Sequence, residues 1–224
     1  MYRRLKSVAC TVVFSLTVVF LSGCGSSSGD ELVYVAIGAS DATGIGAEPP
    51  TDGYVFRIDD GLDSNCGGAE LFNLGIPGLD ADEIANLELP AAEELDPDLV
   101  TVFVGGNDLV GGRDAASFQA DVQELLQTLA ADTDATVFIA TLPDLTLLPR
   151  FQDDPDPDVT AARVAEFNFI IESEAFASGA ILVDLSDNPL SDILVSGDGF
   201  HPSNEGHKKI ADEFLDLIIP TICS

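Results

Sequence analysis

The sequence predicts an α/β protein, a three-layer α/β/α sandwich in which helices cover both faces of a parallel sheet. Two observations predict this fold. Short apolar runs recur along the chain, and segments with the apolar spacing of amphipathic helices separate them. Strands that alternate with helices form βαβ units, and such units build a parallel sheet. The sequence has no internal repeat and no sign of a second domain, so we expect residues 32–224 to form one domain.

The first strand is predicted at residues 32–37, where an apolar run rich in β-forming residues ends at Gly38. Continuous apolar runs of this length are typical of parallel strands that are buried on both faces. The other predicted strands lie at residues 71–74, 99–104, 136–140 and 181–184.

The segments between these strands are predicted to be helices. The apolar residues from Val122 to Leu129 follow the i, i+3, i+4, i+7 spacing of a stripe that faces a core. Phe214 and Ile218 continue a similar stripe near the C-terminus, and Ser203 is placed to cap that last helix. The predicted helices lie at about residues 51–60, 80–95, 114–131, 158–178 and 204–219.

Residues 1–23 have the features of an export signal. Only basic charges precede Val8, and an uncharged apolar run continues to Leu21, shorter than the roughly 20 residues of a spanning helix. The following Leu-Ser-Gly-Cys resembles the lipobox of bacterial lipoproteins, in which the cysteine carries diacylglycerol. We therefore expect a lipidated Cys24, a flexible linker at residues 24–31 and a lipid-anchored protein of the bacterial cell envelope. A plain secretory signal, with Cys24 incidental, is the alternative.

The charge of the chain argues against one class of partner. The sequence has 39 acidic and 9 basic residues, a formal net charge of −30. Such a surface repels phosphate backbones, so we expect no nucleic-acid partner.

The cysteines indicate an exported protein with one cross-link. Cys10 is removed with the signal and Cys24 is assigned to the anchor, which leaves Cys66 and Cys223 as a possible disulfide. No Cys-x-x-Cys pair or Cys/His cluster indicates a zinc site. The Asp-Pro-rich residues 153–158 lack the glycine and glutamate of a calcium loop and are expected to be a solvated loop. We therefore expect no metal and no cofactor.

Candidate catalytic residues follow the predicted strands. Ser40 comes just after the first strand, and parallel sheets place their chemistry at that edge. His201 and His207 are the only histidines, and His207 beside two lysines is expected to face solvent. A serine nucleophile needs a base and a carboxylate that orients it, and His201 and Asp198 can supply these roles. Asp184 at the end of a strand is a competing carboxylate.

Two glycine-rich turns follow the other central strands at the same predicted edge. They contain Gly75 and Asn107, and a backbone N–H or an amide there can donate to an oxyanion. With these blocks the sequence resembles the SGNH/GDSL hydrolase family, from Val33 to about Ile218. Gly-Ala-Ser40-Asp-Ala-Thr-Gly matches the nucleophile block, Gly75 and Asn107 match the oxyanion residues, and Asp198-x-x-His201-Pro matches the last block.

The resemblance implies a flavodoxin-like doubly wound sheet and metal-free hydrolysis of esters through an acyl-serine. Ser40, Asp198 and His201 are then the catalytic residues, and Ser40, Gly75 and Asn107 form the oxyanion hole. Ala39 replaces the aspartate that usually precedes the serine in the family. Short inserts between the blocks imply an open, shallow groove.

The substrate stays open at this point. Lipid, aryl and short acyl esters are favoured, because the apolar residues 145–151 are expected to form a lid or an acyl-chain wall. Simple packing under the loop is the alternative reading of this segment. The alternative functions are an O-acetyl-glycan esterase, a thioesterase or lysophospholipase, and a non-catalytic envelope lipoprotein.

Overall fold

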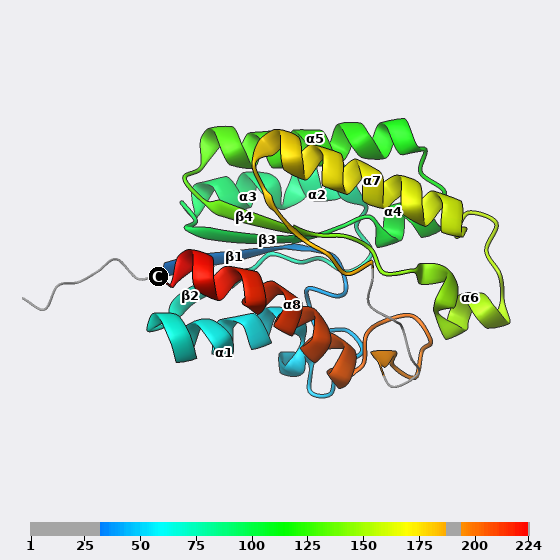
Figure 1. The fold of residues 1–224 in the computed structure, drawn as a ribbon, viewed down its shortest axis with the longest axis horizontal. Coiled ribbons are helices and arrows are strands. Elements are labelled where there is room, and N and C mark those ends of the chain that lie inside the picture. The colour runs from blue at the N-terminus through cyan, green and yellow to red at the C-terminus, as the bar shows by residue number, and fades with distance from the viewer. Residues whose placement is uncertain (1–31, 187–193, 224) are drawn as a thin grey trace, which may run out of the picture. The chain divides into compact units, whose positions relative to one another are not determined.

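A parallel sheet of five strands forms the centre of the computed structural model, which describes residues 32–186 and 194–223 (Figure 1). The predicted signal, the linker and Cys24 lie outside these residues. The strand order is β2-β1-β3-β4-β5, and every neighbouring pair is parallel. This is the order of flavodoxin-like doubly wound sheets, and it confirms the predicted fold class. The strands are β1 (Leu32–Gly38), β2 (Ala69–Asn73), β3 (Leu99–Phe103), β4 (Thr136–Ala140) and β5 (Ile181–Val183).

The strand predictions were accurate because the sheet is buried on both faces. β3 is buried at all five positions, and β1 is buried from Tyr34 to Gly38. A parallel strand in this environment needs apolar side chains at successive positions, so its sequence is a continuous apolar run. Each observed strand lies within two residues of its predicted bounds.

Helices cover the two faces of the sheet in separate groups (Figure 1). α1 (Tyr54–Cys66) and α8 (Asn204–Ile222) lie side by side on one face. The other face carries α2 (Ala81–Leu87), α3 (Leu89–Glu94), α5 (Ala115–Asp132) and α7 (Ala161–Ser178). The shorter elements are η1 (Pro50–Asp52), α4 (Gly106–Val110), η2 (Leu145–Leu147) and α6 (Pro149–Asp153).

The helix predicted at residues 80–95 is divided in the structure. α2 ends at Leu87 and α3 begins at Leu89, with Glu88 between them. Pro90 lies in the first turn of α3, and a proline lacks the N–H that would continue the ladder of α2. The helix predicted from residue 51 also begins later, at Tyr54, because η1 occupies residues 50–52.

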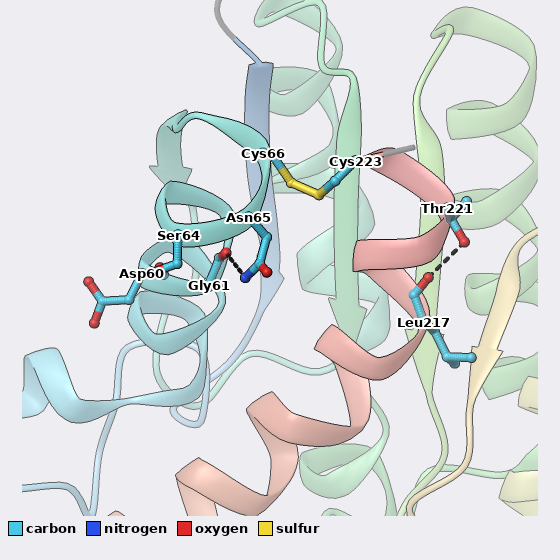
Figure 2. The surroundings of a disulfide bond; sticks show 8 residues. All are labelled: Asp60, Gly61, Ser64, Asn65, Cys66, Leu217, Thr221 and Cys223. Atoms are coloured by element: carbon cyan, nitrogen blue, oxygen red, sulfur yellow. Dashed lines mark hydrogen bonds between the residues drawn. A yellow bond between two sulfur atoms is a disulfide. The ribbon is translucent and has the colours of Figure 1, made fainter.

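The pair formed by α1 and α8 is connected near both of its ends. Cys66 is the last residue of α1 and Cys223 follows α8; the two form a disulfide with their Cα atoms 4.9 Å apart (Figure 2). Near the other end, the ring of Tyr54 stacks on His207 and Phe214, with centroids 6.3 and 5.7 Å away. Ser203 caps α8 as predicted, accepting from the N–H of Gly206. Within the described ranges, no helix is long and apolar enough to cross a membrane.

Candidate active site

The turn after β1 presents Ser40 at the carboxyl edge of the sheet. The Ser40 carbonyl accepts from the Thr43 hydroxyl at 2.8 Å and from the Ile45 N–H at 3.1 Å, which fixes the turn. Gly44 has a φ of +79°, and a Cβ there would lie 2.1 Å from the Pro50 carbonyl oxygen. Glycine is therefore required for this turn to pack, and Ser40 is held with only 6 % of its surface exposed.

A second turn, just before α8, holds Asp198 and His201 together. One carboxylate oxygen of Asp198 accepts from the N–H groups of Phe200 at 2.8 Å and His201 at 3.0 Å, and from the Ser196 hydroxyl at 2.7 Å. The other lies 2.6 Å from Nδ1 of His201. Burial alone would raise the pKa of Asp198, but these hydrogen bonds outweigh it and hold that pKa well below its usual range. The carboxylate is therefore ionised at neutral pH.

The two turns meet, although 161 residues separate them. Nε2 of His201 lies 3.0 Å from Oγ of Ser40. With Nδ1 donating to Asp198, Nε2 carries the lone pair and can accept the hydroxyl proton. Asp184 lies elsewhere, accepting from the hydroxyls of Thr141 and Ser186. The geometry can therefore activate a serine nucleophile through one specific histidine–carboxylate pair.

Asn107 and Gly75 reach the same edge with different donors. Asn107 lies in the first turn of α4, lines the pocket beside Ser40 and donates one amide hydrogen to the Leu79 carbonyl at 2.8 Å. Its second amide hydrogen has no partner among the described residues and can serve a ligand. The Gly75 N–H donates to the side chain of Asn73 at 3.1 Å. An incoming oxyanion would have to replace that acceptor, a detail that the sequence does not reveal.

A pocket with mostly apolar walls opens beside Ser40. Leu145 and Leu148 belong to its wall, while Leu147 is half exposed and Phe151 packs edge-on against Phe200. The apolar 145–151 segment thus supplies both pocket wall and packing beneath the loop, the two alternatives left open from the sequence. The other apolar wall residues include Leu79, Phe103, Leu142, Leu185, Leu194, Val195 and Ile210.

The comparisons with known proteins identify the family. The model of the GDSL-like lipase/acylhydrolase family matches residues 36–209, a span that includes Ser40, Asp198 and His201. The chain belongs to this family. It is a carboxylic ester hydrolase. No curated protein matches the sequence.

Solved structures similar to this GDSL-like hydrolase carry the same fold. A lipase/acylhydrolase from Enterococcus faecalis has a TM-score of 0.69 at 18% identity, over 84% of this chain and 96% of that one. The psychrotrophic esterase EstA from Pseudoalteromonas sp. has a TM-score of 0.68 at 19% identity, over 84% and 97%. Axe2, an acetylxylan esterase from Geobacillus stearothermophilus, has a TM-score of 0.66 at 18% identity, over 83% and 94%.

His207 is buried in this GDSL-like hydrolase, so the prediction that it faces solvent was wrong. It is fully buried, accepts at Nδ1 from the Tyr54 N–H at 3.2 Å and donates from Nε2 to the Ile45 carbonyl at 3.0 Å. Burial lowers the pKa of His207, which keeps the ring neutral. His207 therefore joins α8 to the segment that follows the nucleophile turn.

Asp41 places a carboxyl group in the pocket directly after the nucleophile. Burial raises its pKa to about 6, the charge of His201 opposes this rise, and the charge of Asp198 adds to it. At neutral pH the group is ionised, and it loses its charge in mildly acidic solution.

The acidic residues at 153–158 do not form a metal site. No group of three or more His, Cys, Asp or Glu side chains there is arranged to hold an ion. Asp153 ends α6, and the loop follows it. In this loop the Asp156 side chain accepts from the N–H of Asp158, and Asp158 pairs with Arg163 at 2.8 Å. These carboxylates have structural partners of their own.

Sequence reasoning missed Glu88, a buried carboxylate behind the site. It follows Ala81 by seven residues and Ile84 by four, so it shares their core-facing side of the helix. That spacing is the signal that could have located it.

Proposed function

We propose that this hydrolase cleaves carboxylic esters through an acyl-serine intermediate. The observation that carries the proposal is the continuous contact from Ser40 Oγ to His201 Nε2 at 3.0 Å and from His201 Nδ1 to Asp198 at 2.6 Å. Ser40 Oγ attacks the ester carbonyl while His201 takes its proton, and His201 then returns that proton to the leaving alcohol. Water, deprotonated by the same histidine, cleaves the acyl-serine and releases the acid.

The negative charge that develops on the carbonyl oxygen needs donors. We assign this role to the backbone N–H groups of Ser40 and Gly75 and to the Asn107 side chain. Fixed donors of this kind bind the oxyanion more strongly than the ground-state carbonyl, so they accelerate the reaction instead of only binding the substrate.

The preferred substrates in this proposal are neutral esters with an apolar acyl group. The pocket wall is built mainly from Leu, Val, Ile and Phe side chains, which favour a hydrocarbon chain over a hydrated sugar. An acetylated glycan is the second candidate, supported by the acetylxylan esterases among the structural neighbours. A thioesterase or lysophospholipase activity, or a non-catalytic lipoprotein, are further outcomes of the test.

A fluorophosphonate probe tests the mechanism, because it reacts with an activated serine. We expect labelling of the wild-type protein and none of Ser40→Ala, with Ser186→Ala as a control that leaves the proposed nucleophile intact. A series of p-nitrophenyl esters from acetyl to dodecanoyl, together with acetylated xylan, an acyl thioester and a lysophospholipid, tests the substrate. An unlabelled wild type would support the non-catalytic alternative, and hydrolysis confined to acetylated xylan would contradict the preference for acyl chains.

We further propose that the protein is exported and anchored through a lipidated Cys24. The support is the basic head, the apolar run and the Leu-Ser-Gly-Cys sequence of residues 21–24. Acyl chains add about 0.8 kcal/mol of membrane affinity per buried methylene, so several chains anchor stably. Detergent phase partitioning should place the wild type in the detergent phase and Cys24→Ala in the aqueous phase. A fully aqueous wild type would contradict the anchor.

A further inference from the structure

Glu88 is a buried acid between two catalytic turns. Only 1 % of its surface is exposed, and it lies at the junction of α2 and α3, behind the carboxyl edge of the sheet. An ionised carboxylate in such a place is costly unless hydrogen bonds compensate it. Its position therefore calls for partners.

Both carboxylate oxygens of Glu88 have a backbone partner, one at the end of β1, where the nucleophile turn begins, and one in the Gly75 turn. Oε2 accepts from the N–H of Gly38 at 2.9 Å, two residues before Ser40. Oε1 accepts from the N–H of Ile76 at 3.0 Å, directly after Gly75. The Ile76 N–H also donates to the Gly38 carbonyl at 3.2 Å. One carboxylate thus connects the nucleophile turn to the turn that carries a proposed oxyanion donor.

The Gly75 turn packs tightly on the nucleophile turn at this junction. A Cβ on Gly75 would lie 2.7 Å from the Ala42 side chain and 3.2 Å from the Ala39 carbonyl oxygen. A small displacement of either turn would therefore change the distance between the Gly75 N–H and the oxygen that forms during attack by Ser40. Positioning errors of about 1 Å can lower a reaction rate by about 100-fold.

The two contacts require the ionised form of the acid. Both partners are N–H donors, so each oxygen of Glu88 must accept. A protonated carboxyl group, like a glutamine amide, has a donor on one of its two terminal atoms. That donor would face an N–H group, and one of the two turns would lose its hydrogen bond to Glu88.

We propose that Glu88 is a positioning residue of the ester hydrolase, whose carboxylate holds the nucleophile turn and the Gly75 turn at the spacing that the oxyanion requires. The inference rests on the acyl-serine function proposed above. Glu88 does not touch the substrate, and its effect is exerted through the Gly38 and Ile76 backbones.

The charge state of Glu88 responds to pH near neutrality. Burial raises its pKa to about 7, and the two N–H groups oppose that rise. Tyr34 of β1 and Tyr54 of α1 face the same region, and burial raises both of their pKa values far enough to keep them neutral. Asp41, on the nucleophile turn itself, also acts on Tyr54. The ring of His207 stacks on Tyr54 from α8, and burial lowers its pKa and keeps it neutral.

The test compares Glu88→Gln with the wild type from pH 5.5 to 8.5, using kcat and KM for p-nitrophenyl acetate. At pH 8 we expect kcat of the variant to be 10- to 100-fold lower with KM within about twofold. The ratio of the two kcat values should shrink towards pH 5.5, because the wild-type acid then becomes protonated and loses the same contact. Asp41 and the other titrating groups act on both proteins and cancel in the ratio.

Two further variants complete the test. Glu94→Gln removes the same charge from an exposed position on α3 and should match the wild type. Glu88→Asp keeps the charge but is too short to reach both N–H groups, so its kcat at pH 8 should also fall; it decides the question if Glu88→Gln does not fold. A folded Glu88→Asp with wild-type kcat at pH 8 would overturn the proposal.

The remaining outcomes separate this role from the proposed function. If the ratio of the wild-type and Glu88→Gln kcat values is constant with pH, Glu88 is only structural. A Glu88→Gln variant with wild-type kcat at pH 8 would overturn the proposed positioning role. If fluorophosphonate labels the wild type and the folded variants at equal rates, the Glu88 role fails and the acyl-serine function stands. If the wild type is not labelled, the acyl-serine function fails and the role of Glu88 fails with it.

Discussion

Glu88 should make the folding stability of the protein fall as the pH rises through neutrality. Its pKa is raised from 4.5 to about 7 in the folded state, so between these pH values the folded protein holds a proton that the unfolded chain has released. Unfolding then releases a proton, and stability decreases with pH. The stabilisation is fully present below about pH 4.5 and is lost as the pH passes 7.

The size of the effect follows from the same shift. At 1.36 kcal/mol per pKa unit, it corresponds to roughly 3 kcal/mol in the free energy of unfolding. The steepest slope is about 1.4 kcal/mol per pH unit, because one proton is involved. Glutamine does not titrate, so Glu88→Gln lacks this contribution at every pH.

Urea unfolding followed by circular dichroism, with the disulfide intact, measures the difference between the two proteins. We expect the stability of the wild type relative to Glu88→Gln to fall by about 2–3 kcal/mol between pH 5 and 8. Burial also raises the pKa values of Asp41 and Asp108 to about 6, but both groups are present in both proteins and cancel. A difference that stays constant within 0.5 kcal/mol, a limit of roughly a third of one pKa unit, would refute the reasoning.

Three other predictions concern the triad, the oxyanion hole and the disulfide. Asp198→Asn should lower kcat by about 10⁴, as in serine proteases, whereas Asp184→Asn should lower kcat less than about tenfold. Steady-state kinetics that reversed this order would assign the role of the orienting carboxylate to Asp184. Asn107→Ala should lower kcat by about 10²–10³ with little change in KM. The variant also loses the hydrogen bond to Leu79, which should lower the free energy of unfolding by only about 1 kcal/mol. A much larger loss of stability together with a near-normal kcat would contradict the catalytic role. Cys223→Ser opens a ring of 157 residues and should lower the free energy of unfolding by up to roughly 5 kcal/mol in urea titrations. Two titratable thiols in the denatured, unreduced mature domain, residues 32–224, would contradict the bond.

Elements whose sequence directly reflects their burial could be predicted. β3 and β4 have mainly apolar sequences because both faces of the sheet are covered. The pair of Ser40 and His201 could also be predicted, since a chain with two histidines offers few choices for a base. The spacing of residues alone cannot predict that two segments 161 residues apart are in contact. Here the resemblance of the sequence blocks to a family predicted that contact.

The burial of His207 was missed because its immediate sequence neighbours are polar. His207 stands beside two lysines, but it precedes Phe214 by seven residues and shares the buried stripe of α8. The partner of the Gly75 N–H was beyond prediction for another reason. It depends on the rotamer of Asn73, whose amide also donates to the Ala42 carbonyl, and rotamers are set by tertiary contacts.

The cross-link between Cys66 and Cys223 determines whether a proteolytic cut separates the chain into two fragments. Ser40 precedes the covalent ring that this bond closes, while Asp198 and His201 lie inside it. A single cut within the ring, for instance in the loop at residues 154–158, leaves both fragments on one molecule. The nicked protein should migrate intact on a gel until it is reduced. Nucleophile and base would stay tethered after such a cut, so the enzyme can be nicked without being divided.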